Sequence, residues 1–246
     1  MQGSNNPELD KKDSSLQEVL PFLITASHEL KSPLSLVRQL ALALENGIGT
    51  EAEKQRIIRQ IVLTSERALR LTTDLSRSAR LEDSIFELEP LNPHQICEEV
   101  AHEILPLYKE RGREIRVASK YRPTLVVANR DLLRRIMLNF ADNALYYAES
   151  SQPVELRAST HAGKAKVRLS VRDFGPAIPA DMWQRLEKNL GEAAQPLHMR
   201  PQSSGLGLYV ANQFASAMQG AIGASRHKDG ATFYVDVTAS TQLSLL

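Results

Sequence analysis

With 246 residues, 42% of them hydrophobic and 24% charged, the chain has the length and composition of one large or two modest soluble globular domains. Its 30 basic and 29 acidic residues give a net charge of +1, so it lacks the basic excess typical of proteins that bind nucleic acid or anionic lipid. The single cysteine, Cys97, excludes an internal disulfide, and no stretch approaches the roughly 18–20 apolar residues of a membrane-spanning helix.

The N-terminal third of the chain carries two long helical patterns. After a polar stretch over residues 1–13, which we expect to be a disordered leader, apolar residues recur at steps of three and four over residues 16–44. Gly47 and Thr50 then mark a turn and a new helix start, and a second apolar pattern follows. Two such helices bury too little apolar surface alone. We therefore expect residues 14–82 to form a helical hairpin that pairs with a second copy in a dimeric four-helix bundle.

The first of these helices contains the sequence His-Glu-Leu-Lys-Ser-Pro-Leu at residues 28–34. A carboxylate at Glu29 could reach one ring nitrogen of His28, fix its tautomer and leave the other nitrogen nucleophilic. Ser32 lies one turn after His28 on the same face, where its hydroxyl could position a water molecule. Pro33 removes a helical hydrogen bond and predicts a local bend. The alternative is a histidine on a helix surface with no chemical role.

Residues 83–246 alternate between helical and strand-like patterns. Helices and antiparallel strands in this order favour an α+β fold with one mixed sheet under helices. Helices are predicted over residues 92–109, 129–148 and 205–218, and strands over residues 86–90, 114–118, 124–128, 154–160, 166–172, 221–225 and 232–237.

Three stretches in this half combine polar residues with glycine. The first, Asn-Phe-Ala-Asp-Asn-Ala-Leu-Tyr-Tyr at residues 139–147, places its amides and carboxylate on one helix face, which could otherwise be a solvated surface. The second is Asp-Phe-Gly-Pro-Ala-Ile-Pro at residues 173–179, directly after a predicted strand. The third, Ser-Ser-Gly-Leu-Gly-Leu at residues 203–208, opens an apolar helix, where free backbone N–H groups and the helix dipole favour an anion.

In order and spacing, the histidine-containing helix and these three stretches resemble the phosphoacceptor and nucleotide-binding boxes of two-component sensor histidine kinases. The resemblance covers about residues 14–237. It implies a Bergerat-type α/β sandwich that binds ATP and Mg²⁺, a fold shared with the Hsp90 and MutL families. It also implies that His28 is phosphorylated by ATP and passes the phosphoryl group to an aspartate of a response regulator. Phosphatase activity toward that regulator, supported by Ser32, is part of the same expectation.

The resemblance also assigns roles to single residues. His28, Glu29 and Ser32 are the expected catalytic residues, and residues 187–204 the expected mobile lid over the nucleotide. Asn143 is the expected Mg²⁺ ligand, because an amide oxygen is a hard ligand and Mg²⁺ keeps several waters. Nucleotide binding is assigned to Asn139 near the phosphates, Tyr147 against the adenine, Asp173 at the adenine amine, and Gly175, Ala177, Gly205, Leu206, Gly207 and Leu208.

The chain departs from the family pattern at several places. Ser32 replaces a threonine, Tyr146 a lysine and Ala177 a glycine, and the phenylalanines that often precede the lid are missing. If position 177 requires a positive φ, alanine costs on the order of 1 kcal/mol there. A first alternative is therefore a degenerate kinase that binds ATP weakly and acts as a dimeric scaffold or regulator phosphatase. A second, an ATPase that shares only the fold, gives no reason for the histidine-containing helix.

The expected partners follow from this assignment. They are a second copy of the chain and the receiver domain of a response regulator, with neither nucleic acid nor direct membrane contact. We expect a cytoplasmic protein, either by itself or as the cytoplasmic portion of a longer membrane-anchored sensor.

Overall fold

The computed structural model describes residues 7–47, 49–78, 81, 86–118, 124–147, 151–161, 165–190 and 206–241. The chain divides into a helical unit and a mixed unit that begins at Ser76. None of the helices in the described ranges combines the length and the apolar character needed to cross a bilayer. The predicted α+β class is confirmed.

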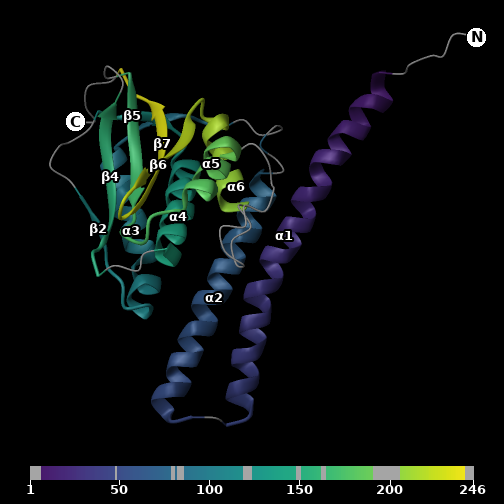
Figure 1. The fold of residues 1–246 in the computed structure, drawn as a ribbon, viewed down its shortest axis with the longest axis vertical. Coiled ribbons are helices and arrows are strands. Elements are labelled where there is room, and N and C mark those ends of the chain that lie inside the picture. The colour runs from purple at the N-terminus through teal and green to yellow at the C-terminus, as the bar shows by residue number, and fades with distance from the viewer. Residues whose placement is uncertain are drawn as a thin grey trace, which may run out of the picture. The chain divides into compact units, whose positions relative to one another are not determined.

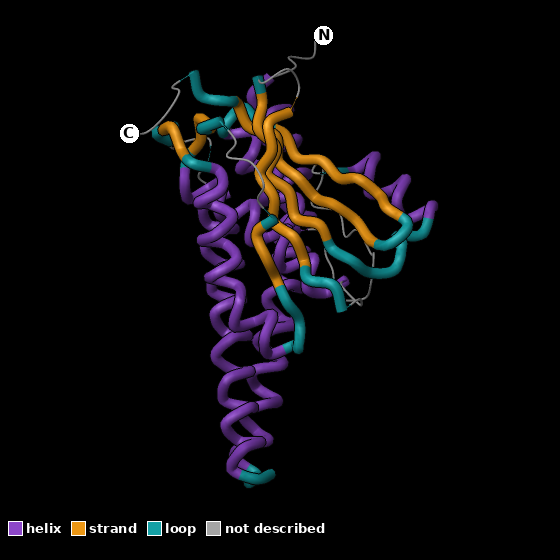
Figure 2. The backbone as a smooth tube through the Cα atoms, turned by 90° about the vertical axis from the view of Figure 1, so that its left-hand side faces the viewer, coloured by secondary structure: helices purple, strands orange, loops and turns teal. Residues whose placement is uncertain are grey.

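The helical unit is built from α1 (Pro7–Glu45) and α2 (Glu51–Ser78), which run antiparallel to one another (Figures 1 and 2). The predicted hairpin of two long helices is thus present. However, α1 begins at Pro7 rather than near residue 14, so a disordered leader over residues 1–13 is not what the structure shows for residues 7–13. Proline suits a first helical position because its missing N–H has no partner there in any case.

The turn between the two helices follows the predicted chemistry. Gly47 has a φ of +68° and Gly49 a φ of +102°, a region that strains side chains other than glycine. The backbone N–H of Thr50 donates to Glu53 Oε2 at 2.6 Å, and the N–H of Glu53 donates to Thr50 Oγ1 at 3.4 Å. This reciprocal pair is a capping box, and its backbone hydrogen bond lowers the pKa of Glu53.

The hairpin leaves much apolar surface in contact with water. Leu34 is 61% exposed and Leu69 is 67% exposed, although large apolar side chains on a finished helix pair are normally covered. Seven of the eight exposed large hydrophobic residues among the described side chains belong to this hairpin: Ile24, Leu34, Leu36, Leu42, Ile58, Val62 and Leu69.

The mixed unit contains a five-stranded sheet in the order β2-β4-β5-β7-β6 (Figures 1 and 2). β2 is parallel to β4 and the other pairs are antiparallel, so the predicted mixed sheet is confirmed. β1 and β3 form a separate antiparallel pair rather than extending this sheet. The strands are β1 (Glu89–Leu91), β2 (Ile115–Val117), β3 (Val126–Ala128), β4 (Val154–His161), β5 (Lys166–Arg172), β6 (Ala221–His227) and β7 (Gly230–Thr238).

Four helices belong with this sheet: α3 (Pro93–Glu110), α4 (Arg130–Tyr147), α5 (Ala180–Asn189) and α6 (Leu206–Ala217). α3, α4 and α6 match the predicted helices, whereas α5 was not predicted and its last turn occupies the start of the expected lid. The pattern of Met182, Trp183 and Leu186 after Pro179 could have indicated it, since Leu186 is fully buried. The remainder of the expected lid lies outside the described residues.

The core lies between the sheet and the helices. α4 packs on β4, β5 and β7, and α3 packs on β2 and β4. Alternate residues of β5 and β7 are buried toward the helices, as strands covered on one face require, and Phe140 of α4 meets Phe233 of β7 with ring centroids 6.0 Å apart. This packing fixes the position of α4, which carries the first polar stretch.

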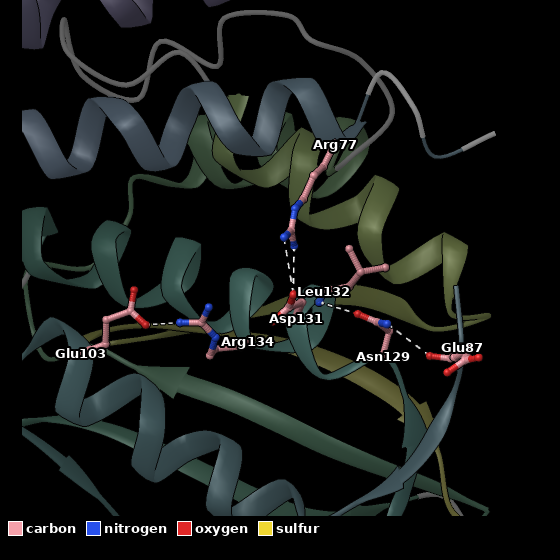
Figure 3. A network of polar contacts seen from close by, with 7 residues as sticks. All are labelled: Arg77, Glu87, Glu103, Asn129, Asp131, Leu132 and Arg134. Atoms are coloured by element: carbon pink, nitrogen blue, oxygen red, sulfur yellow. Dashed lines mark hydrogen bonds and ion pairs between the residues drawn. The ribbon is translucent and has the colours of Figure 1, made fainter. Parts of the chain in front are cut away.

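Polar contacts hold the start of α4 in place (Figure 3). Asn129 caps the helix by accepting the N–H of Leu132 at 3.1 Å, and its amide donates to the carbonyl oxygen of Glu87 at 3.2 Å. Asp131 forms an ion pair with Arg77 at 3.4 Å. Two further pairs, Arg130–Glu99 and Arg134–Glu103, link α4 to α3 at successive turns.

Candidate nucleotide-binding site

α4 presents the predicted polar face. Its apolar positions, among them Ile136 and Phe140, are fully buried, whereas Asn139, Asp142 and Asn143 are partly exposed on the other side. The 3.6-residue period of the helix separates the two sets. The side chains of Tyr146 and Tyr147 lie outside the described residues, so the predicted adenine contact of Tyr147 stays a prediction.

Asn139 meets the first turn of α6. A Cβ placed on Gly207 would lie 3.9 Å from the side-chain amide carbon of Asn139, so these two of the predicted stretches converge. The amide nitrogen of Asn139 is buried and has no hydrogen-bond partner within the described part of the chain. An unpaired buried donor costs about 1–3 kcal/mol. A ligand oxygen, such as that of a phosphate, would satisfy it.

The glycine-containing helix start contributes backbone rather than side chains. Leu206 and Leu208 are 1% and 6% exposed, so neither offers its side chain to a ligand, and any contact they make comes from their N–H groups. At the N-terminus of a helix such groups carry positive partial charge, which favours an anion. Gly205 lies outside the described residues.

Asp173 follows β5 directly and is 4% exposed. Its Oδ1 accepts the N–H of Ala231 at 3.1 Å, while its own N–H donates to the carbonyl oxygen of Ala231 at 3.0 Å. Burial raises the pKa of this carboxyl to about 6, against the opposing effects of the Ala231 hydrogen bond and of Arg172. A buried carboxylate that is ionised at neutral pH is suited to accept from a donor such as an exocyclic amine.

Tyr108 of α3 links the polar stretch at residues 139–147 to the one at residues 173–179, a role that no sequence pattern indicates. Its buried hydroxyl donates to the carbonyl oxygen of Ala141 at 2.8 Å. Burial raises the pKa of the phenol, and the charges of Asp142 and Asp173 raise it further, so both carboxylates lie within electrostatic reach of one hydroxyl. The polar face of α4 and the end of β5 therefore converge.

The loop after Asp173 adopts an unstrained conformation. Gln219 is the sole non-glycine residue with a positive φ within the described residues, so Ala177 adopts an ordinary backbone conformation and incurs no cost from its Cβ. The reason for expecting weaker nucleotide binding from Ala177 is thereby removed. The N–H of Gly175 donates to the carbonyl oxygen of Asp229 at 3.2 Å, so this glycine contacts the turn between β6 and β7.

Gly230, the first residue of β7, also belongs to the candidate site. Its φ is +125°, and a Cβ there would lie 2.6 Å from Asp173 Oδ1. Both the backbone conformation and the close approach require glycine. The pairing of an Asp-Gly turn with a buried aspartate depends on register across the sheet, which no local pattern reveals.

The predicted phosphoacceptor residues lie in α1. His28 and Ser32 are exposed, and Glu29 is partly exposed. Since all three belong to one continuous helix, His28 and Ser32 share a face as predicted. The bend expected at Pro33 stays a prediction.

The polar face of α4 offers an amide oxygen of the kind that Mg²⁺ accepts as a ligand. No group of three histidine, cysteine or carboxylate side chains suited to a metal occurs in the described ranges. Mg²⁺ commonly needs one or two protein oxygens because phosphates and waters complete its shell. The partly exposed amide of Asn143, on the same helix face as Asn139, can supply such an oxygen.

Comparison with known proteins places this geometry in a family. Residues 128–241 match the family described as histidine kinase-, DNA gyrase B- and HSP90-like ATPases. The sensor histidine kinase AruS of Pseudomonas aeruginosa is 29% identical over 227 residues, which cover 88% of this chain and 22% of AruS. The chain thus spans less than a quarter of that relative.

Two solved structures share the fold over most of the chain. Full-length ShkA in complex with AMPPNP is 27% identical, with a TM-score of 0.60 over 89% of this chain and 46% of that one. The histidine kinase ThkA in complex with the response regulator TrrA is 16% identical, with a TM-score of 0.62 over 95% of this chain and 66% of that one. Residues 128–241 thus match the ATPase family, and over most of its length the chain is similar in sequence and fold to two-component sensor histidine kinases.

Proposed function

We propose that the chain is a protein-histidine kinase that binds ATP between α4, the end of β5 and the start of α6, and phosphorylates His28. Two observations support this proposal. The amide donor of Asn139, unpaired within the described residues, lies against Gly207 in the first turn of α6, and the buried carboxylate of Asp173 acts on the same Tyr108 hydroxyl as Asp142 of α4. In the same chain an exposed histidine is available as the acceptor.

Different residues of the site bind different parts of the nucleotide. Asp173 accepts from the adenine amine, while the amide of Asn139 and the N-terminus of α6 bind phosphate oxygens. Asn143 would hold Mg²⁺, which neutralises charge on the phosphates when bound. Most of the rate enhancement in phosphoryl transfer comes from such positioning and charge neutralisation.

His28 supplies the nucleophile. A ring nitrogen attacks the γ-phosphorus in line, forming an N–P bond as the bond from phosphorus to the β,γ-bridging oxygen breaks and ADP leaves. Glu29 holds the proton on the other ring nitrogen. In the second step, a carboxylate of a response-regulator receiver domain attacks phosphorus and the histidine leaves. Ser32 would orient a water molecule that removes the phosphoryl group from the regulator.

A dimer is part of the proposal. The exposed apolar residues of α1 and α2, such as Leu34 and Leu69, need a covering surface, and a second hairpin of the same sequence supplies one. At about 25 cal/mol per Å² of buried apolar surface, covering several such side chains offsets the cost of association.

Incubation with γ-labelled ATP and Mg²⁺ tests the proposal directly. The wild type should acquire label that is stable in base and lost in acid, as expected of phosphohistidine. His28→Gln should acquire none while still binding ATP, whereas Asn143→Ala should lose both the label and Mg²⁺-dependent nucleotide binding. Label that resists acid, or that persists in His28→Gln, would contradict the proposal.

The degenerate kinase remains as a second candidate, on the grounds of Tyr146 and the missing phenylalanines. The unstrained conformation of Ala177 counts against it. Calorimetry of ATP binding separates the two candidates. An active kinase should bind ATP, whereas a degenerate kinase should be folded and dimeric and bind its regulator, but bind ATP weakly or not at all.

A further inference from the structure

We infer that the turn between β6 and β7 (residues 228–229), together with Gly230 at the start of β7, is a clamp that positions the loop of residues 173–179, called the Asp173 loop below. Arg172 and Asp229 are positioning residues that set the selectivity of the site for adenine. The inference rests on the function proposed above. It assigns to this hairpin a part in recognising the nucleobase.

Arg172 is the centre of the clamp. Its guanidinium forms an ion pair with Asp229 at 2.5 Å, donates to the carbonyl oxygen of Asp173, and lies over the ring of Phe174 with its central carbon 4.5 Å from the ring centroid. The Arg172 side chain is 16% exposed, so its contacts with the Asp173 carbonyl oxygen and the Phe174 ring form largely out of water, whereas Asp229 is 64% exposed and water screens its ion pair with Arg172. One side chain thus holds both the start of the loop and the turn.

The rest of the loop is fastened to the same hairpin. The N–H of Gly175 donates to the carbonyl oxygen of Asp229, and Nε of Arg226 donates to the carbonyl oxygen of Ile178 at 2.6 Å. Gly230 allows the turn to approach Asp173 so closely that a Cβ would collide with its carboxylate. The loop is therefore held at its beginning, middle and end.

These contacts matter because, in the proposed complex, the carboxylate of Asp173 alone recognises the amine of the adenine base. A hydrogen bond weakens steeply when its length or angle departs from the optimum, so selectivity for an amine over a carbonyl at the purine depends on how firmly Asp173 is placed. With ATP the carboxylate meets a donor; with ITP, which has a carbonyl oxygen at that position, two acceptors face one another. In a loosened loop the Asp173 carboxylate can move away from the carbonyl oxygen of ITP, which relieves the repulsion. Loosening the loop should therefore weaken ATP binding more than ITP binding.

The sheet itself provides a matched control. Arg168, four residues before Arg172 on β5, likewise pairs with an aspartate, contacting Asp236 through two 2.7 Å hydrogen bonds, and likewise lies over an aromatic ring, that of Tyr234 at 3.5 Å. It contacts no residue of the Asp173 loop through these interactions. Removing Arg168 should therefore cost comparable packing and charge without loosening the loop.

The test measures dissociation constants for ATP and ITP with the wild type, Arg172→Met and Arg168→Met. Arg172→Met should weaken ATP binding about tenfold more than ITP binding, which corresponds to the loss of roughly one charge-assisted hydrogen bond. Arg168→Met should leave the ratio within about twofold of the wild type. Because Arg172→Met could fold poorly, Asp229→Ala at the exposed turn provides a second variant, with the same direction of change expected.

The pH profile of ATP binding provides a readout that a purely structural role would not move. The charged groups that act on Asp173 are Arg172 and Asp229, and Tyr108 faces it from α3. Removing the positive charge of Arg172 should shift the loss of ATP binding to higher pH, and Arg168→Met should not.

The outcomes are separable. An unchanged ratio of ATP to ITP affinity in both Arg172→Met and Asp229→Ala, with the wild type binding ATP, overturns the clamp alone. An equal fall in the ratio of ATP to ITP affinity in Arg168→Met also overturns the clamp, because the change would then follow from disturbing the sheet anywhere and not from loosening the Asp173 loop. A folded wild type that binds no ATP overturns both the clamp and the proposed kinase.

Discussion

Replacing Asp173 by asparagine should stabilise the fold while destroying selective ATP binding. Burial raises the pKa of this carboxyl to about 6 from its ordinary 3.8. At about 1.4 kcal/mol per pKa unit, keeping the group ionised at neutral pH costs up to about 3 kcal/mol of folding free energy. Asparagine has nearly the same shape, keeps an oxygen to accept the N–H of Ala231, and carries no charge to bury.

The sign of the pH dependence follows from proton counting. Between about pH 4 and pH 6 the folded protein holds more protons at Asp173 than the unfolded chain does, so this residue makes stability fall as pH rises through that window. Above this pH window the folded protein carries the full free-energy cost of burying the ionised Asp173, and below the window Asp173 is protonated and the cost is absent. Asp173→Asn should therefore exceed the wild type in stability by up to about 3 kcal/mol at pH 7.5 and match it near pH 4.

Urea unfolding followed by tryptophan fluorescence measures this difference. The chain has a single tryptophan, Trp183, which lies in α5 and so reports on the mixed unit. The reasoning is refuted if Asp173→Asn is less stable than the wild type at pH 7.5, or if the difference between them is the same at both pH values. The same titration should show ATP affinity in the wild type falling below about pH 6, because a protonated Asp173 cannot accept from the adenine amine.

Three further predictions concern other parts of the molecule. Gly230→Ala should abolish ATP binding in calorimetry, because its Cβ would displace the Asp173 carboxylate; binding at wild-type strength would exclude that collision. Thr50→Ala should cost about 1 kcal/mol of helix stability in thermal unfolding by breaking the capping box, yet leave the ATP dissociation constant unchanged. Leu69→Glu should shift the species seen in analytical ultracentrifugation from dimer to monomer, whereas Glu66→Gln, one turn away and also exposed, should not; a Leu69→Glu variant that stays dimeric would place the dimer interface elsewhere.

Sequence patterns predicted the elements whose signals are local. The two hairpin helices, the capping residue Thr50 and the strands of the central sheet all carry short-range signatures, and the structure contains them. The start of α1 was placed too late, because a polar first turn on Pro7 has no apolar periodicity to reveal it. The helix α5 was not predicted, because its apolar period is short and lies between turn-forming residues and a polar stretch.

Site residues that belong to a local motif could be predicted from the sequence. Residues whose role depends on which strands and helices pack against one another could not. Asn139 and Gly207 could be assigned from their stretches, and the structure brings them together. Tyr108, Arg172 and Gly230 could not, because their roles come from contacts across the sheet or between α3 and α4. The cost attached to Ala177 failed for the same reason: the loop conformation is set by its contacts with the hairpin turn, not by residue type alone.

The central claim is that His28 receives the γ-phosphoryl group of ATP. Trypsin should release residues 13–31 as one peptide, in which His28 is the only histidine. Mass spectrometry of this peptide at neutral to basic pH, after incubation with ATP and Mg²⁺, should detect one added phosphoryl group that a brief acid treatment removes. The unmodified peptide from a folded, ATP-binding protein, or an acid-stable modification on one of its serines, would contradict the claim.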